Sequence, residues 1–253
     1  MLLPIGDEPN PRHFPVMTVA LIVVNVAAYL LVALPLSMQR PDPGDPLLAE
    51  YLRAVLPHLP PGTSPQDVMQ QITAYDLVVY RWGFRPNAPS PVTLLTAMFL
   101  HGGLMHLFGN MLYLWIYGNN VEDRLGKAAY LFWYLATGIA ATLFFMAFNL
   151  GSPLPLVGAS GAISGVLGFY FVWFPRNIVK LWIFLFPFYM GVVRVRATYV
   201  LVVYLVLDNL LPFLLVPAGG GGVAHGAHIG GFIAGALVAL ILGRTPSRGP
   251  EAS

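Results

Sequence analysis

Six apolar stretches, each close to the length of a membrane-spanning helix, constrain this chain more than any other feature of its sequence. A helix needs about 20 apolar residues to cross the hydrocarbon core of a bilayer. Only 9% of the 253 residues are charged and the mean hydropathy is +0.70, which leaves too few charges to cover a water-exposed surface. The sequence therefore predicts an all-α membrane protein, a bundle of six transmembrane helices over residues 16–36, 104–121, 128–150, 158–174, 198–216 and 227–242.

The segments around these stretches divide the chain further. We expect an N-terminal segment over 1–15, a membrane domain over 16–243 that includes a long structured loop over 37–95, and a disordered tail over 244–253. The first stretch is longer than the apolar core of a signal peptide, so we interpret it as a retained helix and not as a cleaved leader. The apolar segment 178–193 is broken by Pro187 and flanked by basic residues, which favours an interfacial or re-entrant segment. A seventh span is the competing interpretation.

Lysine and arginine predict the orientation of this bundle, because cytoplasmic loops carry an excess of both. With six spans, nine of the thirteen fall on the side of the two termini, and the other four lie in the long 37–95 loop. Both termini are therefore expected in the cytoplasm and the long loop outside. A seventh span would divide the nine basic residues between the two sides.

Several function classes are excluded or disfavoured. The chain has no cysteine, which excludes disulfides, thiolate metal sites and a cysteine nucleophile. Its net charge of +2 does not suggest a nucleic-acid partner. The H-E-x-x-H zinc motif is absent, and no carboxylate accompanies the histidines at matching spacing. We therefore expect neither a metal nor another cofactor.

Four polar side chains in the apolar stretches are candidate site residues, because such groups are costly in a membrane and usually face protein or water. His106 and Asn110 are four residues apart and share a helix face. Ser160 and His228 each lie near the start of their own stretch. In the six-span arrangement these three stretches enter from the outer side, so all four residues fall at one depth.

Small residues predict how two of the stretches meet. Gly161 and Gly165 lie four apart in the fourth stretch, and Gly231 and Gly235 four apart in the sixth. This spacing lets helix backbones approach closely. If the two faces meet, Ser160 comes within reach of His228.

This arrangement suggests serine hydrolysis. A serine hydroxyl becomes a strong nucleophile when a base takes its proton, and His228 is the candidate base. Asn110, His106 and the free N–H groups at the start of the fourth helix are candidate donors for an oxyanion. Asp208 is a weaker candidate for an acid that orients His228, and we favour a structural role for it, facing the bundle interior. Ser160 does not lie in a G-x-S-x-G nucleophile elbow, because Ala162 replaces the second glycine.

Several motifs resemble the rhomboid family of intramembrane serine proteases. They are GASG at 158–161, HGGLMHLFGN at 101–110, AHIGGFIAG at 227–235, VEDRLG at 121–126 and RWG at 81–83. The resemblance covers most of the chain and implies a six-helix core in a prokaryotic plasma membrane. It implies Ser160 as nucleophile and His228 as base, with His106, Asn110 and the Ser160 amide forming the oxyanion hole. It also implies single-span membrane proteins as substrates, with the fifth helix and the loop containing Gly219–Gly222 as substrate gate and cap.

One position departs from the family pattern. Many relatives carry an aromatic residue four positions after the nucleophile, stacked on the catalytic histidine, and this chain has Ser164 there. Either His228 is held less firmly or another ring takes that place. Two other functions stay open: a non-catalytic rhomboid-like protein that binds membrane helices in trafficking or quality control, and a small transporter that uses the polar cluster as a pathway.

Overall fold

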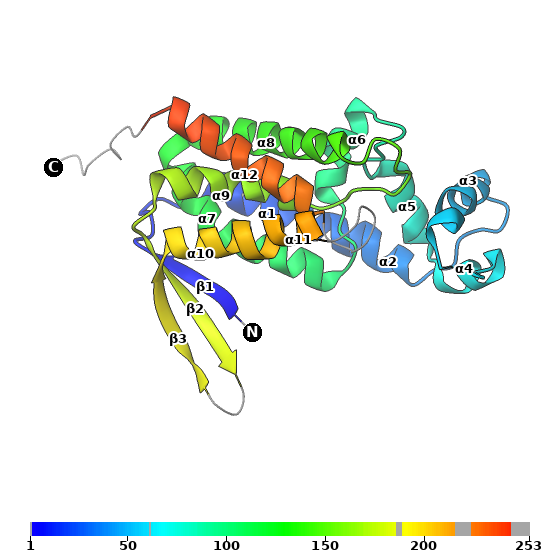
Figure 1. Ribbon diagram of the computed structural model, residues 1–253, viewed down its shortest axis with the longest axis horizontal. Coiled ribbons are helices and arrows are strands. Elements are labelled where there is room, and N and C mark those ends of the chain that lie inside the picture. Colours follow the sequence, from blue (N-terminus) through cyan, green and yellow to red (C-terminus); the bar gives the residue numbers. More distant parts are fainter. Residues whose placement is uncertain (1, 61, 186–188, 216–223, 244–253) are drawn as a thin grey trace.

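Helices occupy each of the six apolar ranges in the computed structural model, which describes residues 2–60, 62–185, 189–215 and 224–243. The predicted tail after residue 243 and the loop over 216–223 lie outside the described residues. Figure 1 shows the long helices side by side along the horizontal axis. They are α1 (Val16–Ala28) with α2 (Leu34–Ser37), α7 (Leu104–Leu125), α8 (Lys127–Ala147), α9 (Ser160–Trp173), α10 (Ala197–Leu205) with α11 (Leu211–Leu215), and α12 (His225–Ile241).

Length and composition mark some of these helices as membrane spans. The continuous helices Val16–Ser37, Lys127–Ala147 and Ala197–Leu215 are long and apolar enough to cross a bilayer. A fourth candidate joins Pro91–Phe99 to Leu104–Leu125 across a bend of 91°. α9 and α12 are apolar but shorter. A mostly helical chain with three or four candidate membrane spans confirms the predicted class of fold, and the number of six spans stays a prediction.

The first and fifth of these long helices each contain one wide π turn. The turns are Tyr29–Ala33 and Val206–Leu210, called η1 and η4. Each ends just before a proline, Pro35 or Pro212. Proline has no N–H and its ring clashes with the carbonyl four residues earlier, so a helix that continues through it must widen or bend.

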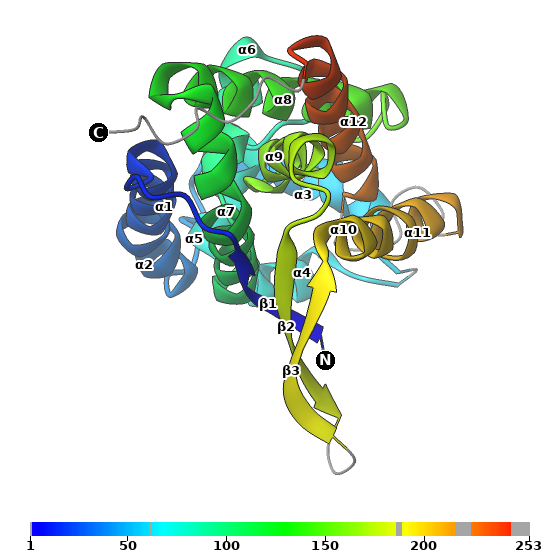
Figure 2. The same ribbon diagram turned by 90° about the vertical axis from the view of Figure 1, so that its left-hand side faces the viewer.

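α9 lies at the centre of the bundle, surrounded by α7, α8, α10 and α12 (Figure 2). Eleven of its fourteen residues are buried. Such a helix is shielded from lipid by its neighbours, which explains how a short helix with Gly161, Ser164, Gly165 and Gly168 is accommodated in a membrane bundle. The Tyr117 ring of α7 packs edge-on against Tyr170 of α9, and Tyr117, Tyr130, Tyr134 and Tyr170 are almost completely buried.

The predicted long loop contains short helices at one end of the bundle (Figure 1). These are α3 (Pro46–Val55), the 3-10 turn η2 (Leu56–His58), α4 (Pro65–Gln71), α5 (Ala74–Trp82) and α6 (Pro91–Thr96). α4 and α5 begin with capping boxes, Ser64 with Asp67 and Thr73 with Asp76. Around α3 and α4 the buried residues Leu48, Val68, Ile72 and Leu77 form a small separate core.

A three-stranded antiparallel sheet departs from the all-α prediction. β2 (Ile178–Leu185) and β3 (Tyr189–Arg196) form a hairpin, and β1 (Leu2–Glu8) pairs with the outer edge of β2. The sheet projects from the end of the bundle opposite α3–α6 (Figures 1 and 2). A seventh transmembrane helix over 178–193 is therefore wrong for the described residues, and the interfacial or re-entrant placement stays a prediction. The backbone of this segment is satisfied by strand pairing and not by a helix.

Polar contacts attach the N-terminal segment to the bundle. The buried Asp7 carboxylate accepts hydrogen bonds from Tyr170 and, at 2.7 Å, from Asn120. Glu122, near the end of α7, accepts bonds of 2.8 Å from the backbone N–H groups of Met17 and Thr18. α1 has no side-chain cap of its own, so the Glu122 carboxylate satisfies donors at its N-terminus and complements the helix dipole.

Candidate active site

Ser160 and His228 meet near the end of the bundle that carries α3–α6. Ser160 is the first residue of α9, and His228 lies in the first turn of α12. The Ser160 Oγ and the His228 Nε2 are 2.8 Å apart, a hydrogen-bond distance. Both side chains are half-buried. A hydroxyl and an imidazole nitrogen in this geometry can exchange a proton.

Direct backbone contact between α9 and α12 produces this approach. A methyl group added at Gly231 would lie 2.1 Å from the carbonyl oxygen of Gly161, and one at Gly235 would lie 1.9 Å from that of Gly165. Both distances are far inside van der Waals contact, so any side chain at these two positions would push the two helices apart. The two glycine pairs singled out in the sequence therefore face each other.

His106 and Asn110 lie beside the chain that leads into α9. A Cβ built on Gly158 would be 2.8 Å from the His106 Nε2 and 3.7 Å from the Asn110 Nδ2. Gly158 also has φ +122°, a backbone conformation that residues with side chains rarely adopt. Glycine at this position thus lets the His106 ring pack directly against the backbone two residues before Ser160.

The hydrogen-bond donors of these two side chains are available. The Asn110 Nδ2 is buried and finds no hydrogen-bond acceptor among the described residues. The Gly102 N–H donates to the His106 Nδ1 over a long 3.4 Å, which leaves the ring proton on Nε2. A buried donor without a partner is costly in a folded protein. Such a donor is typical of a site that is completed by an acceptor from a bound molecule.

A residue that sequence reasoning left without a role, Asn209, contacts the other side of His228. Its Oδ1 lies 2.7 Å from the His228 Nδ1, and its side chain is 1% exposed. The neighbouring Asp208 is exposed, so the expectation that it faces the bundle interior is wrong. The only signal in the sequence is an adjacent polar pair in an apolar stretch, and the pair does not reveal which member points inward.

The place left by Ser164 is taken by a ring from another helix. The Tyr204 ring of α10 is stacked on His228, with centroids 6.3 Å apart and planes inclined by 28°. The Ser164 Oγ lies 2.6 Å from the Tyr204 hydroxyl. The small side chain at 164 therefore leaves room for Tyr204 and contacts its hydroxyl.

Two further histidines lie near this group. His101, in the turn before α7, is 1% exposed, and its ring lies edge-on to that of His106 at 5.2 Å. His225 begins α12, and its ring lies edge-on to that of His228 at 6.5 Å. Across the described ranges, no group of three or more His, Cys, Asp or Glu side chains is arranged to hold a metal ion.

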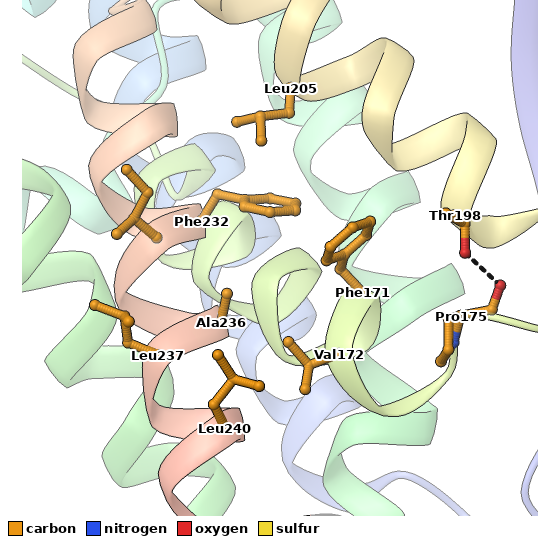
Figure 3. Close-up of a pocket in the computed structure, with 10 residues that line it drawn as sticks. Phe171, Val172, Pro175, Thr198, Leu205, Phe232, Ala236, Leu237 and Leu240 are labelled. Carbon is orange, nitrogen blue, oxygen red and sulfur yellow. Dashed lines mark hydrogen bonds between the residues drawn. The ribbon is translucent and has the colours of Figure 1, made fainter.

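An apolar groove of about 460 Å³ lies between α9, α10 and α12 (Figure 3). Phe232 lies one helical turn beyond His228, and Leu205 directly follows Tyr204. At the opposite end of the groove, the Thr198 Oγ1 donates to the Pro175 carbonyl oxygen at 2.7 Å. The side chains that line the groove are mostly apolar and suit a hydrocarbon chain. Ser160, His228, His106 and Asn110 lie outside the groove.

Comparison with known proteins places the chain in one family. A family model described as "Rhomboid domain" matches residues 89–245. The chain is 35% identical over 154 residues to Rhomboid protease GluP of Bacillus subtilis (strain 168), covering 59% of this chain and 26% of that protein. It is 28% identical over 153 residues to the mitochondrial Rhomboid protein 1 of Saccharomyces cerevisiae (strain ATCC 204508 / S288c), covering 51% of this chain and 44% of that protein.

A third relative, the putative rhomboid protease YdcA of Bacillus subtilis (strain 168), is 37% identical over 83 residues, which cover 30% of this chain and 38% of the relative. The matched region thus spans less than half of each of these three relatives. The Rhomboid domain model, by contrast, matches well over half of the present chain and includes all four candidate site residues. The chain belongs to the rhomboid family.

Proposed function

We propose that this protein is an intramembrane serine endopeptidase that cleaves membrane-spanning segments of other proteins with a Ser160–His228 dyad. The 2.8 Å contact between the Ser160 Oγ and the His228 Nε2 carries the proposal. Relatives named as rhomboid proteases support it. The alternative within the family is a non-catalytic protein that binds membrane helices, for which the dyad geometry would have no use.

The reaction follows from the contacts of the two residues. The Ser160 hydroxyl gives its proton to the His228 Nε2 as its oxygen attacks the scissile carbonyl carbon. The resulting tetrahedral oxyanion collapses, the peptide C–N bond breaks, and His228 returns the proton to the leaving amine. A water molecule then attacks the acyl-enzyme ester, giving one proton to His228, and Ser160 recovers its hydroxyl proton from His228 as the carboxylic product leaves.

The oxyanion is stabilised by donors at the start of α9 and from α7. The backbone N–H of Ser160 is at the helix N-terminus, where the first N–H groups have no partner within the helix. The Asn110 Nδ2, buried without an acceptor among the described residues, and the His106 Nε2 proton lie beside Gly158. Donors held in advance of the reaction need no reorganisation as negative charge develops.

A single-span membrane protein is the substrate class that this site suits. A helix in lipid has its backbone groups bonded internally, so its carbonyls are closed to attack until the helix unwinds. A site near the end of the bundle, with half-buried Ser160 and exposed His106, admits both water and an unwound segment. The partners of the protein are thus the bilayer and single-span substrates. We expect no nucleic-acid partner.

We further propose six spans, with both termini in the cytoplasm and the site opening on the extracytoplasmic side of a prokaryotic inner membrane. The pairing of β1 with β2 supports this topology, because residues 2–8 and 178–185 must lie on one side of the membrane. An even number of crossings must then separate them, and α1, α7, α8 and α9 supply four. Lys180, Arg194 and Arg196 lie in this sheet and Arg176 lies just before it, as expected for the cytoplasmic side.

Cleavage of a labelled single-span substrate by purified protein in detergent tests the proposal. Ser160→Ala should reduce kcat/KM by roughly 10³-fold or more, because the nucleophile is lost while the fold is kept. A fluorophosphonate probe should label the wild type at Ser160 and leave the variant unlabelled. Equal cleavage by the two proteins would exclude the serine mechanism and favour the non-catalytic alternative.

A further inference from the structure

The contacts of Asn209 determine which nitrogen of His228 carries a proton. The Asn209 Nδ2 donates to the Tyr204 carbonyl oxygen at 2.8 Å, and a carbonyl only accepts. This fixes the amide orientation and places the Oδ1, also an acceptor only, 2.7 Å from the His228 Nδ1. The Nδ1 must therefore carry the hydrogen. The lone pair on Nε2 then faces the Ser160 hydroxyl, as a general base requires.

The π turn in the fifth long helix lets Tyr204 and Asn209 contact His228 at the same time. In an α-helix, Tyr204 and Asn209 would point about 140° apart at 100° per residue. Within η4, hydrogen bonds reach five residues back, as in the bond from the Leu211 N–H to the Val206 carbonyl. The wider turn brings Asn209 into line with the Tyr204 carbonyl. π turns of this kind are frequent at functional sites.

Tyr204 restricts the His228 ring in a second direction. Its stacked ring lies along the face of the imidazole, and its hydroxyl is held by the Ser164 Oγ at 2.6 Å. Ser164 is completely buried in α9, the helix that also begins with Ser160. The Asn209 contact thus acts in the plane of the imidazole and the Tyr204 contact on its face.

The helix that supplies both contacts lies at the edge of the bundle. In the apolar part of Ala197–Leu215, 11% of the residues are buried in the protein, against 17% for Val16–Ser37 and 33% for Lys127–Ala147. The groove of Figure 3 separates α10 from α9 and α12 directly beside Leu205. A small movement of this helix can therefore alter the Asn209 and Tyr204 contacts without disturbing the central α9–α12 pair.

We propose that Asn209 and Tyr204 are positioning residues for His228, so that alignment of the dyad depends on how the Ala197–Leu215 helix is seated. The proposal rests on the Ser160–His228 mechanism proposed above. Asn209 selects the tautomer and Tyr204 limits the ring rotation. Loss of these two contacts would release the His228 ring and lower the rate even with Ser160 in place.

The test compares Asn209→Ala and Asn209→Asp with Asp208→Asn, a matched change at the adjacent exposed position. Asn209→Ala should lower kcat roughly 10- to 100-fold with little change in KM, because the bound substrate is not touched. Asn209→Asp should retain most of the activity, since a carboxylate also accepts from the Nδ1 hydrogen. Because its charge also favours the protonated ring, the acidic limb of its pH–rate profile should move to higher pH. Asp208→Asn should match the wild type in kcat and in pH profile.

Tyr204 is tested by separating its ring from its hydroxyl. Tyr204→Phe keeps the ring stacked and should stay within about threefold of the wild type, whereas Tyr204→Ala should lose tenfold or more in kcat. Ser164→Ala removes the same hydroxyl contact from the other side and should match Tyr204→Phe. Thermal unfolding in detergent separates these losses from misfolding.

Two results would overturn the inference while leaving the dyad intact. One is an Asn209→Ala variant within twofold of the wild type in kcat while Ser160→Ala is inactive. The other is a pH–rate profile of Asn209→Asp that matches the wild-type profile. This second result decides the question even if Asn209→Ala does not fold. Equal activity of Ser160→Ala and the wild type would instead remove the underlying mechanism, and the inference with it.

Discussion

Replacing Gly231 by alanine tests whether contact between α9 and α12 sets the dyad distance. The added methyl carbon would lie 2.1 Å from the Gly161 carbonyl oxygen and 3.1 Å from the carbonyl carbon. Carbon and oxygen atoms in close contact across helix interfaces stay about 3.3 Å or more apart. The obstacle is backbone and cannot rotate away, so the two helices must separate by about 1.2 Å at this point.

This separation acts almost directly on the dyad. Gly231 lies three residues after His228, and Gly161 directly follows Ser160. Added to the present 2.8 Å, a shift of this size carries the Nε2–Oγ distance to about 4 Å, beyond hydrogen-bond range. A misplacement of about 1 Å at an active site costs roughly 10²-fold in rate. Overpacking costs about 1–3 kcal/mol and the better helix propensity of alanine returns about 1 kcal/mol. The net loss of stability is therefore about 0–2 kcal/mol.

The assay measures kcat/KM on a single-span substrate together with the thermal unfolding midpoint in the same detergent. Gly118→Ala is the matched control: its methyl group meets the Tyr130 hydroxyl at 2.6 Å, at an interface of α7 that does not include Ser160 or His228. We expect both variants to lose some stability and only Gly231→Ala to lose about 10²-fold in kcat/KM. The reasoning is refuted if Gly231→Ala keeps wild-type kcat/KM, or if Gly118→Ala loses as much activity as Gly231→Ala.

Three further substitutions test other parts of the structure. Gly158→Ala forces an alanine to φ +122° against the His106 ring. The variant should lose about 1–3 kcal/mol of stability, measured by thermal unfolding, and its kcat should also fall. A wild-type kcat would show that Gly158 does not hold His106 in place. In Glu122→Gln, either orientation of the glutamine amide places its NH₂ opposite a backbone N–H at the start of α1, so the free energy of unfolding should fall by about 1–3 kcal/mol. Asp123→Asn, at the adjacent exposed position, is the control and should leave stability unchanged. Burial raises the pKa of Asp7 from 3.8 to about 6, so its contribution to stability is complete below pH 4 and is lost as pH rises towards 6. The loss corresponds to about 3 kcal/mol. Asp7→Asn should therefore raise the melting temperature at pH 7.5 and leave it nearly unchanged at pH 4; the same gain at both pH values would contradict this assignment.

The helical part of the fold follows from local information in the sequence. Each helix in lipid bonds its own backbone, so apolar length alone places it, and the observed helix Val16–Ser37 differs from the predicted 16–36 by one residue. The contact between the glycine pairs of α9 and α12 is equally local, because small residues four apart mark one face of one helix. From those two patterns, sequence reasoning placed Ser160 within reach of His228.

The sheet was missed because its backbone partner is remote in the sequence. The run IVKLWIFL is apolar without a clear period, and such a run does not distinguish a strand from a helical or interfacial segment. What stabilises it as a strand is pairing on both sides, with 189–196 across a short connection and with residues 2–8 from the other end of the chain. The pairing with β1 has no counterpart in any local pattern.

The support of His228 shows the same limit at the level of single side chains. With Ser164 alone, sequence reasoning had to allow a less firmly held histidine. The structure instead supplies a ring from Tyr204, forty residues further on, and an amide oxygen of Asn209 that accepts a hydrogen bond from His228. The small residue and the distant tyrosine are complementary, because Ser164 both makes room for the ring and contacts its hydroxyl. An aromatic residue on α9 would hold the His228 ring without any contribution from the Ala197–Leu215 helix. Because Tyr204 and Asn209 hold the ring here, the position of His228 depends on that helix, which lies beside the apolar groove.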